Sequence, residues 1–464
     1  MTLNEKQQQF YDYVSSISQS SPSTSSRMIR LVAPGGTGKT HTIKQIYRNS
    51  KGSVKIIAPT HKACSLFQRE DVAATTIHKF MHATRHIDDD GNVTFPFNVP
   101  EKRKGVNVII VDECSMISSD MYNVFLELCD KYHIVFVGDN CQIPPVNEDY
   151  SPVFNATNMI EFTFTENMRS RDSLSNLIVE NYRRSVSTRY FPGVQEHEKI
   201  LQSEVVEYFK QNQDAVILSW RNARVSKWNT FIHDEIHKDK PVVNPYMEGD
   251  RLVFSGVRTI QLENGVDSFD YHTSDIITIK SIRTESIEFE QKMSSYQIAD
   301  YMQTGRIRKC RVTGVKGFHD PFVTIRFWAI TDGMGVEWYI PYDEENKRLL
   351  SNYLKHWKSI ILHIPCTERK SEWVKYYNFK ETYDPNLRHV FSSTVHKAQG
   401  SQWDNVFVDM TDISSNFYDA RYKLAYTAVS RMVRNVKFII EDHKMVKGHP
   451  VKVKSDDPPL QRLL

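Results

Sequence analysis

A turn rich in glycine follows an apolar run near the N-terminus and carries the residues best suited to chemistry. Gly35, Gly36 and Gly38 have no side chains, so the backbone there can wrap around an anion and turn its N–H groups inward. Lys39 and Thr40 open the expected helix, whose positive end would face that anion. The pattern predicts a phosphate-binding loop in which Lys39 reaches the β- and γ-phosphates of a nucleotide and the Thr40 hydroxyl holds Mg²⁺.

The pattern G-x-x-x-x-G-K-[ST] is met at every position except the first, which is Ala33, and Thr37 lies within the loop. A second apolar run, Val108–Val111, is followed by the acids Asp112 and Glu113. We expect Asp112 to hold Mg²⁺ as a Walker-B aspartate does, and Glu113 to orient or deprotonate the attacking water. The alternative is that both acids only cap the strand.

Gln142 follows a third apolar run, which places its neutral amide near the γ-phosphate if the runs are adjacent strands. An amide in that position can sense the phosphate and pass its loss to a neighbouring domain. Read alone, the loop around Gln142 is ordinary turn chemistry.

Short, β-branched, apolar runs alternate with helical stretches, which is typical of strands buried on both faces of a parallel sheet. The first set comprises Ile29–Val32, Val54–Ala58, Val108–Val111 and Ile134–Val137. The second set comprises Ala215–Ser219, Val390–Ser393, Val406–Asp409 and Val436–Ile440. The sequence therefore predicts an α/β fold with two parallel sheets joined by right-handed crossovers.

Other segments have a different texture. Residues Asn4 to Ile17 have apolar groups at helical spacing, and residues 86–97 contain an Asp-Gly-Asn turn signal between extended arms, which predicts a protruding hairpin. Between Tyr246 and Tyr342, five short β segments are separated by Gly, Asp and Pro, which indicates a small antiparallel barrel followed by a helix over Glu344–Ile361. The expected segments are Arg251–Phe254, Ile276–Ile282, Cys310–Val315, Phe322–Ile330 and Glu337–Ile340.

The composition sets bounds on the class of protein. The chain has 464 residues, of which 40% are hydrophobic, and 59 basic against 56 acidic residues, so a nucleic-acid partner would need a local basic groove. Six widely spaced cysteines form no C-x-x-C motif, which argues against a zinc ribbon or a disulfide framework. No long apolar run is present. We expect no membrane association and a cytoplasmic protein, in the host cytoplasm if the source is viral.

Several further segments resemble the motifs of superfamily-1 helicases of the 5′-to-3′, RecD-like branch, the group of the phage Dda-like helicases. Leu3–Gln7 resembles the adenine-reading Q motif, and Ala58–Ala63 and Thr75–His78 resemble two DNA-contacting motifs. Thr165–Ser170 resembles motif IV, while Ser393–Ser401 and Tyr426–Arg431 resemble motifs V and VI. The resemblance covers most of the chain.

The resemblance implies roles for individual residues. Gln7 would contact the base, Gly400 would belong to the nucleotide site, and Arg169 and Arg431 would be γ-phosphate arginines. The residues that it implies for DNA contact are Thr60, His61, His78, Phe95, Phe97, Thr394 and His396. A solvated surface charge is the alternative for either arginine.

Three alternatives stay open at the level of sequence. His78, His82 and His86 would share one helical face at a spacing that a metal can use, or they form a solvated or DNA-facing surface. Trp220, Trp228 and Trp403 are candidates for stacking on bases, or for packing in a core. The hairpin aromatics Phe95 and Phe97 would form a wedge that splits the duplex, or they simply pack the hairpin.

The resemblance implies two RecA-like domains with an inserted hairpin and an inserted SH3-like barrel. We expect domain 1A over residues 1–170 with hairpin 1B at about 83–105, domain 2A over 171–245 and 388–464, and domain 2B over 246–387. The expected function is an ATP- and Mg²⁺-dependent DNA helicase that translocates 5′-to-3′ on single-stranded DNA, in replication, recombination or repair. The alternatives are an ATPase that displaces bound proteins without unwinding, and a scaffold with an inactive loop. The expected partners are single-stranded DNA, a DNA fork and a single-strand-binding or replication protein, with a monomeric motor.

Overall fold

The computed structural model describes residues 3–20, 28–166, 168, 173–261, 268–291, 322–416, 418–440, 443–446 and 449–452. The chain divides into two compact units. Unit 1 comprises Met1–Thr84, Phe97–Asp239 and Phe391–Leu464, and unit 2 comprises Arg85–Pro96 and Lys240–Val390. Within the described part of the chain, no helix has both the length and the apolar character needed to cross a lipid bilayer.

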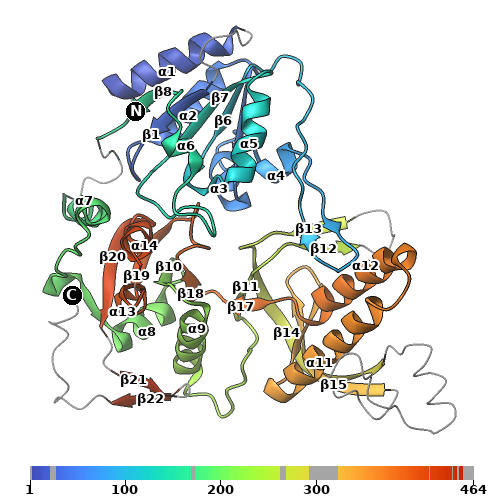
Figure 1. Ribbon diagram of the computed structural model, residues 1–464. Coiled ribbons are helices and arrows are strands. Elements are labelled where there is room, and N and C mark those ends of the chain that lie inside the picture. The colour runs from blue at the N-terminus through green and yellow to red at the C-terminus, as the bar shows by residue number, and fades with distance from the viewer. Residues whose placement is uncertain are drawn as a thin grey trace. The chain divides into compact units, whose positions relative to one another are not determined.

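The first sheet of unit 1 has six parallel strands and includes all four runs of the first predicted set (Figure 1). Its spatial order is β3 (Ala74–Thr76), β2 (Val54–Ala58), β6 (Val108–Val111), β7 (His133–Gly138), β1 (Met28–Val32) and β8 (Ile160–Thr163). Every residue of β6 and β7 is buried, because helices cover both faces of the sheet. The carboxyl ends of β1, β7 and β6 are therefore neighbours at one edge.

Helices cover this sheet on both sides. Side chains of α1 (Glu5–Ser18), α2 (Lys39–Asn49) and α3 (His61–Gln68) pack into one apolar cluster with β1 and β2. Those of α4 (Ile77–Phe80) and α5 (Ser119–Leu128) pack into a second cluster on the other face, and the short α6 (Pro152–Asn155) contributes Val153 to it. Helix α1 begins at the predicted place because Asn4 forms a capping box with Gln7.

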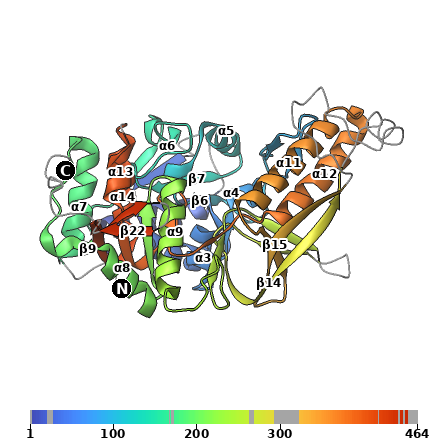
Figure 2. The ribbon, with the colours of Figure 1, turned by 90° about the horizontal axis from the view of Figure 1, so that it is seen from below.

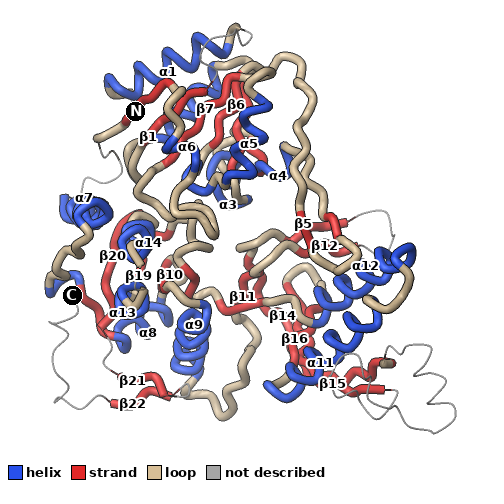
Figure 3. The backbone as a smooth tube through the Cα atoms, in the orientation of Figure 1, coloured by secondary structure: helices blue, strands red, loops and turns tan. Residues whose placement is uncertain are grey.

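The second sheet of unit 1 is also parallel and confirms the second predicted set. Figure 3 shows its strands β10, β19 and β20 in red. Its order is β18 (Ser392–Thr394), β10 (Ala215–Ser219), β19 (Trp403–Val408), β20 (Met432–Ile440) and β9 (Lys199–Leu201). One face packs against α7 (Ser173–Thr188), α13 (Met410–Ser414) and α14 (Ala420–Val429), the other against α8 (Gln202–Gln211) and α9 (Asn222–His237). A hairpin of β21 (His443–Val446) and β22 (His449–Lys452) follows β20.

Unit 2 is built on an antiparallel sheet, as the change of sequence texture predicts. The strands lie in the order β16 (Glu337–Pro341), β15 (Phe322–Asp332), β14 (Ile276–Glu290), β11 (Arg251–Phe254) and β17 (Leu387–His389), with a separate ladder of β12 (Arg258–Gln261) and β13 (Ser268–Tyr271). The expected segment Cys310–Val315 lies outside the described residues. The SH3-like barrel stays a prediction.

Among the described residues of unit 2, the helices α11 (Glu344–Ile361) and α12 (Cys366–Tyr383) lie side by side against β15 and β16 (Figure 2). The bounds of α11 are those predicted. No local pattern predicted α12, because this helix has little amphipathic periodicity and its buried residues are Trp373 and Tyr376 alone.

The predicted hairpin exists as β4 (His86–Ile87) and β5 (Val93–Thr94), and it packs on α12. The indole Nε1 of Trp373 donates to the Asp89 carbonyl (3.2 Å), and the Tyr377 hydroxyl donates to the Gly91 carbonyl (2.6 Å). These contacts join segments 284 and 286 residues apart in the chain. The hairpin therefore belongs to unit 2 in space, although unit 1 flanks it in sequence.

Candidate active site

The glycine-rich turn joins β1 to α2, as predicted. Gly38 is the residue that caps α2, and its φ of +82° lies in the left-handed region that glycine adopts without strain. A Cβ at Gly38 would lie 2.6 Å from Nε2 of Gln7, which itself donates a hydrogen bond to the Thr37 carbonyl (2.9 Å). The Lys39 ammonium donates to the Ala33 carbonyl across the turn (2.9 Å). Helix α1 thus braces the loop through Gln7.

A cavity of about 440 Å³ opens at this turn and is lined by residues from both parallel sheets of unit 1. Among the predicted site residues it is lined by Gly35, Gly36, Gly38, Lys39, Thr40, Asp112, Glu113, Gln142 and Arg431. Three predicted nucleotide ligands are not among its described lining. Gln7 is engaged by Asn4 and Thr37, the Thr37 hydroxyl donates to Pro34, and Gly400 packs against Thr60 and Ala63.

The two acids lie where β6 ends, opposite the phosphate-binding turn. Asp112 is 7% exposed, and burial, followed by the charge of Glu113, raises the pKa of its carboxyl group, while Lys39 and Arg431 oppose that rise. A divalent cation held by Asp112 and the Thr40 hydroxyl would offset the repulsion between the carboxylates, and both groups are oxygen donors that Mg²⁺ prefers. When bound, Mg²⁺ would neutralise charge on the phosphates.

Glu113 has an unusual backbone conformation for a residue with a side chain, with φ at +51°. Conformations of this kind store strain and cluster at functional sites. The side chain reaches toward Arg431, with Oε1 3.7 Å from Nη1. The other oxygen, Oε2, is buried and has no hydrogen-bond partner among the described residues.

Gln142 and Arg431 complete the cavity from the two sheets. Gln142 follows β7, is 2% exposed, and its Oε1 is likewise a buried acceptor without a partner in the described structure. Arg431 follows α14, is 4% exposed, and donates from Nε to the Thr427 carbonyl (3.3 Å). The two unsatisfied acceptors, Glu113 Oε2 and Gln142 Oε1, suit the hydrogens of an attacking water, whereas Lys39 and Arg431 suit phosphate oxygens.

Arg169, the other predicted arginine, lies outside the described residues.

The predicted DNA-contacting residues in unit 1 follow the carboxyl ends of strands. Thr60 follows β2, and its hydroxyl accepts from the Ala63 N–H at the start of α3 (3.1 Å). Thr394 ends β18, and its hydroxyl accepts from the Lys397 N–H (3.3 Å). The neighbouring His61 and His396 are half-buried, and burial lowers the pKa of His396. A hydroxyl that accepts can also donate, so both threonines can serve a phosphate oxygen.

The structure contradicts one alternative for the three histidines, a metal site on a shared helical face. Helix α4 ends at Phe80, and His82 has a φ of +48°, so the chain turns away before it reaches His86 in β4. His78, His82 and His86 therefore share no helical face.

The two hairpin aromatics differ in exposure. Phe97 packs on the apolar cluster that α4 and α5 form with the first sheet, and its ring centroid lies 5.1 Å from that of His78. Phe95 belongs to unit 2 and is 49% exposed.

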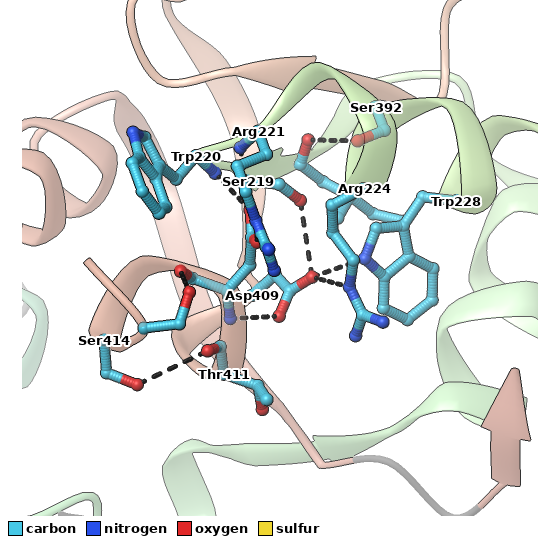
Figure 4. A network of polar contacts seen from close by, with 12 residues as sticks. Ser219, Trp220, Arg221, Arg224, Trp228, Ser392, Asp409, Thr411 and Ser414 are labelled. Carbon is cyan, nitrogen blue, oxygen red and sulfur yellow. Dashed lines mark hydrogen bonds and ion pairs between the residues drawn. The ribbon is translucent and has the colours of Figure 1, made fainter. Parts of the chain in front are cut away.

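Of the three tryptophans that were candidates for stacking on bases, Trp228 is a core residue. Figure 4 shows it beside Arg224 and Asp409. It is 0% exposed, and its indole Nε1 donates to Asp409 Oδ2 (2.6 Å), an atom that also accepts from Arg224 Nε (2.6 Å). Trp220 lies at the end of β10 with its backbone N–H bonded to Asp412, and its ring is partly buried. Trp403 is also partly buried, with the Lys62 ammonium 5.0 Å from its ring.

Sequence reasoning missed two residues beside the cavity, Asp139 and Tyr426. Both are fully buried and hydrogen-bonded to each other. The signals in the sequence are that Asp139 lies three residues before Gln142 and that Tyr426 begins the segment Tyr426–Arg431, which resembles motif VI.

Comparisons with known proteins agree with this geometry. Residues 2–204 match the AAA domain family, and residues 389–432 match the family of UvrD-like helicase C-terminal domains. The chain is 24% identical to the uncharacterized protein R530 of Acanthamoeba polyphaga mimivirus, covering 89% of this chain and 96% of that protein. It is 25% identical to the ATP-dependent DNA helicase dda of Enterobacteria phage T4, covering 87% of this chain and 92% of that protein.

Among solved structures, the Pif1 helicase from Candida albicans is similar over 95% of this chain and 94% of that chain, with 14% identity and a TM-score of 0.47. The first family match contains Lys39 and Asp112, and the second contains Arg431, so the cavity is built from both matched segments. The two family matches and the similarity to the phage helicase together support a superfamily-1 helicase of the Dda-like kind, with the activity of an ATP-dependent DNA helicase.

Proposed function

We propose that this protein translocates 5′-to-3′ on single-stranded DNA and unwinds duplex DNA, with ATP hydrolysed in the cavity of unit 1. The observation that carries the proposal is the contact of Arg431 with Glu113, because it brings an arginine from the second sheet into the cleft that holds the phosphate-binding loop. An arginine that leaves and re-enters such a cleft would couple hydrolysis to relative motion of the two sheets.

In this proposal Lys39, Arg169 and Arg431 neutralise charge on the γ-phosphate. Thr40 and Asp112 hold Mg²⁺, while Glu113 and Gln142 position the water. Gln7 contacts the base, and Gly400 shapes the nucleotide site from the second sheet.

The proposed DNA path follows the strand ends that carry Thr60, His61, His78, Thr394 and His396. Hydroxyls and backbone N–H groups there would contact phosphates without reading bases. The exposed Phe95 would act at the fork, and Phe97 would support it. The domain boundaries given in the sequence analysis are part of the proposal, as are a monomeric motor and a single-strand-binding or replication partner.

The test is ATP hydrolysis by the purified chain with and without single-stranded oligothymidylate, beside Lys39→Ala. We expect strong stimulation by DNA that Lys39→Ala abolishes. Unwinding of duplexes with a 5′ or a 3′ single-stranded tail then tests polarity. Equal hydrolysis with and without DNA would contradict the proposal, and stimulation without strand separation would favour an ATPase that displaces bound proteins.

A further inference from the structure

The loop that follows β7 leaves the first sheet and inserts among residues of the second. Ile143 packs in the apolar cluster of the second sheet. Its N–H donates to the Thr427 hydroxyl (3.1 Å), and its carbonyl accepts from Gln399 Nε2 (3.0 Å). Both partners are buried residues that come from the second sheet and its helices. The loop is thus fixed on two sides by groups that belong to the opposite half of the cleft.

Asp139 begins this loop and forms its strongest contact. The carboxylate is 0% exposed and accepts a hydrogen bond from the Tyr426 hydroxyl through Oδ2 (2.5 Å). Its other oxygen accepts from the Cys141 N–H (3.1 Å) and lies 3.7 Å from Nη2 of Arg183. A buried carboxylate is tolerated only when such partners replace water. Burial and the Asp139 charge raise the pKa of Tyr426, so its hydroxyl keeps the proton that it donates.

Tyr426 and Thr427 lie in the last turn of α14, directly before Arg431. The Thr427 carbonyl accepts from Arg431 Nε, while its hydroxyl accepts from Ile143. The same turn of helix is therefore bonded to the Gln142 loop on one side and to the arginine on the other. Moving the loop away from Tyr426 would change the direction in which Arg431 enters the cavity.

We propose that Tyr426 is a positioning residue for ATP hydrolysis, which through its hydrogen bond to Asp139 holds α14 so that Arg431 and Gln142 face the same nucleotide. The inference rests on the proposed function. Tyr426 itself does not line the cavity in the described structure, so it acts through Arg431.

The experiment compares DNA-stimulated hydrolysis by Tyr426→Phe with that by Tyr182→Phe. Tyr182 is the matched control, because it lies in the same apolar cluster, is 2% exposed, and has a hydroxyl without a hydrogen-bond partner in the described structure. We expect Tyr426→Phe to lower kcat about tenfold, since a hydrogen bond to a buried charge is lost, and to change KM for ATP less than about twofold. Tyr182→Phe should leave both constants unchanged.

A second arm asks whether Tyr426 acts through Arg431. Tyr426→Phe is introduced into Arg431→Ala, and kcat is measured in single turnovers. If the effect passes through the arginine, the added substitution changes kcat less than about twofold. A tenfold loss in both backgrounds would overturn the proposal, as would equal kcat values for Tyr426→Phe and Tyr182→Phe.

Should Tyr426→Phe melt too low to assay, Asp139→Asn keeps the shape of the acceptor and removes its charge, and the same criteria apply. Absence of DNA-stimulated hydrolysis in the unmodified protein would instead contradict the proposed function, so the two failures are distinguishable.

Discussion

At the scale of single residues, the cleft holds opposite charges away from water before any phosphate enters. Arg431 is 4% exposed and has Glu113 as its ion-pair partner, and truncating one member of a buried pair leaves the other uncompensated. Arg431 therefore balances the charge of Glu113 in the nucleotide-free cleft, and we expect it to balance the charge of the phosphates during hydrolysis.

Arg431→Ala should lower kcat by about 10³-fold or more, because an arginine that stabilises the charge of phosphoryl transfer contributes about 10³–10⁵ in rate. The matched control is Arg434→Ala, since that side chain is 72% exposed and pairs with Asp404 at the surface. Steady-state hydrolysis with saturating DNA measures both. A loss of less than about tenfold in Arg431→Ala would remove the arginine from the reaction.

The thiol of Cys141 should react slowly with iodoacetamide at pH 8. Burial, followed by the charge of Asp139, raises its pKa to about 11. Only the thiolate reacts, so the reactive fraction at pH 8 is about one thousandth. The rate should rise about tenfold per pH unit up to pH 10, whereas a short cysteine peptide should level off near pH 9. Peptide mass spectrometry measures both, and a plateau near pH 9 for Cys141 would contradict the assignment.

At the scale of elements, long-range hydrogen bonds lock loops onto helices. At the end of β19, Asp409 accepts from Trp228, Arg224 and Ser219 and thereby ties β19 to α9 and β10 (Figure 4). The Arg224 side chain is only 14% exposed, and its Nε lies 2.6 Å from Oδ2 of this carboxylate.

Asp409→Ala should lower the free energy of unfolding by about 3–5 kcal/mol, because it removes the buried carboxylate that Trp228, Arg224 and Ser219 share. Asp404→Ala is the control, since its partner Arg434 is exposed and a surface pair contributes about 0–1 kcal/mol. Urea denaturation measures both changes. Equal losses would show that the buried pair is not what stabilises this edge of the sheet.

The close packing of the hairpin on α12 requires a glycine at position 91. Gly91 has a φ of +79°, and a Cβ there would lie 2.4 Å from the ring of Trp373. Gly91→Ala should therefore weaken protection of residues 86–94 against hydrogen exchange. Gly52→Ala is the control, because Gly52 also has a positive φ (+89°) but a Cβ there would have nothing within 4 Å. This variant should lose only the free energy that a left-handed backbone costs alanine, about 1 kcal/mol. Unchanged protection in Gly91→Ala would contradict this packing.

At the scale of the whole molecule, each of the two units has its own apolar clusters, and the nucleotide cavity lies wholly within unit 1. We expect calorimetry to resolve two unfolding transitions. ADP with Mg²⁺ at about 100 times its dissociation constant should stabilise unit 1 by about 2.7 kcal/mol. The midpoint temperature of the unit 1 transition should therefore rise, and that of unit 2 should not change. Equal shifts of both would contradict independent units.

The sequence by itself determined the two parallel sheets, the phosphate-binding turn, and the acids at the end of β6. These features are local, because a buried strand shows itself in consecutive apolar residues and a turn in its glycines. It also determined the bounds of α11, and those of α1 to within one residue at each end. It failed at α4, where a short helix and a residue with positive φ broke the expected histidine face.

Only the tertiary structure decided which of these pieces meet. The bond from Tyr426 to Asp139 spans 287 residues of chain, and that from Trp373 to Asp89 spans 284. The burial of Trp228 and the contact of Arg431 with Glu113 likewise depend on elements far apart in sequence. No local pattern encodes such pairs, because they form only when the packing of whole sheets and helices brings distant side chains together.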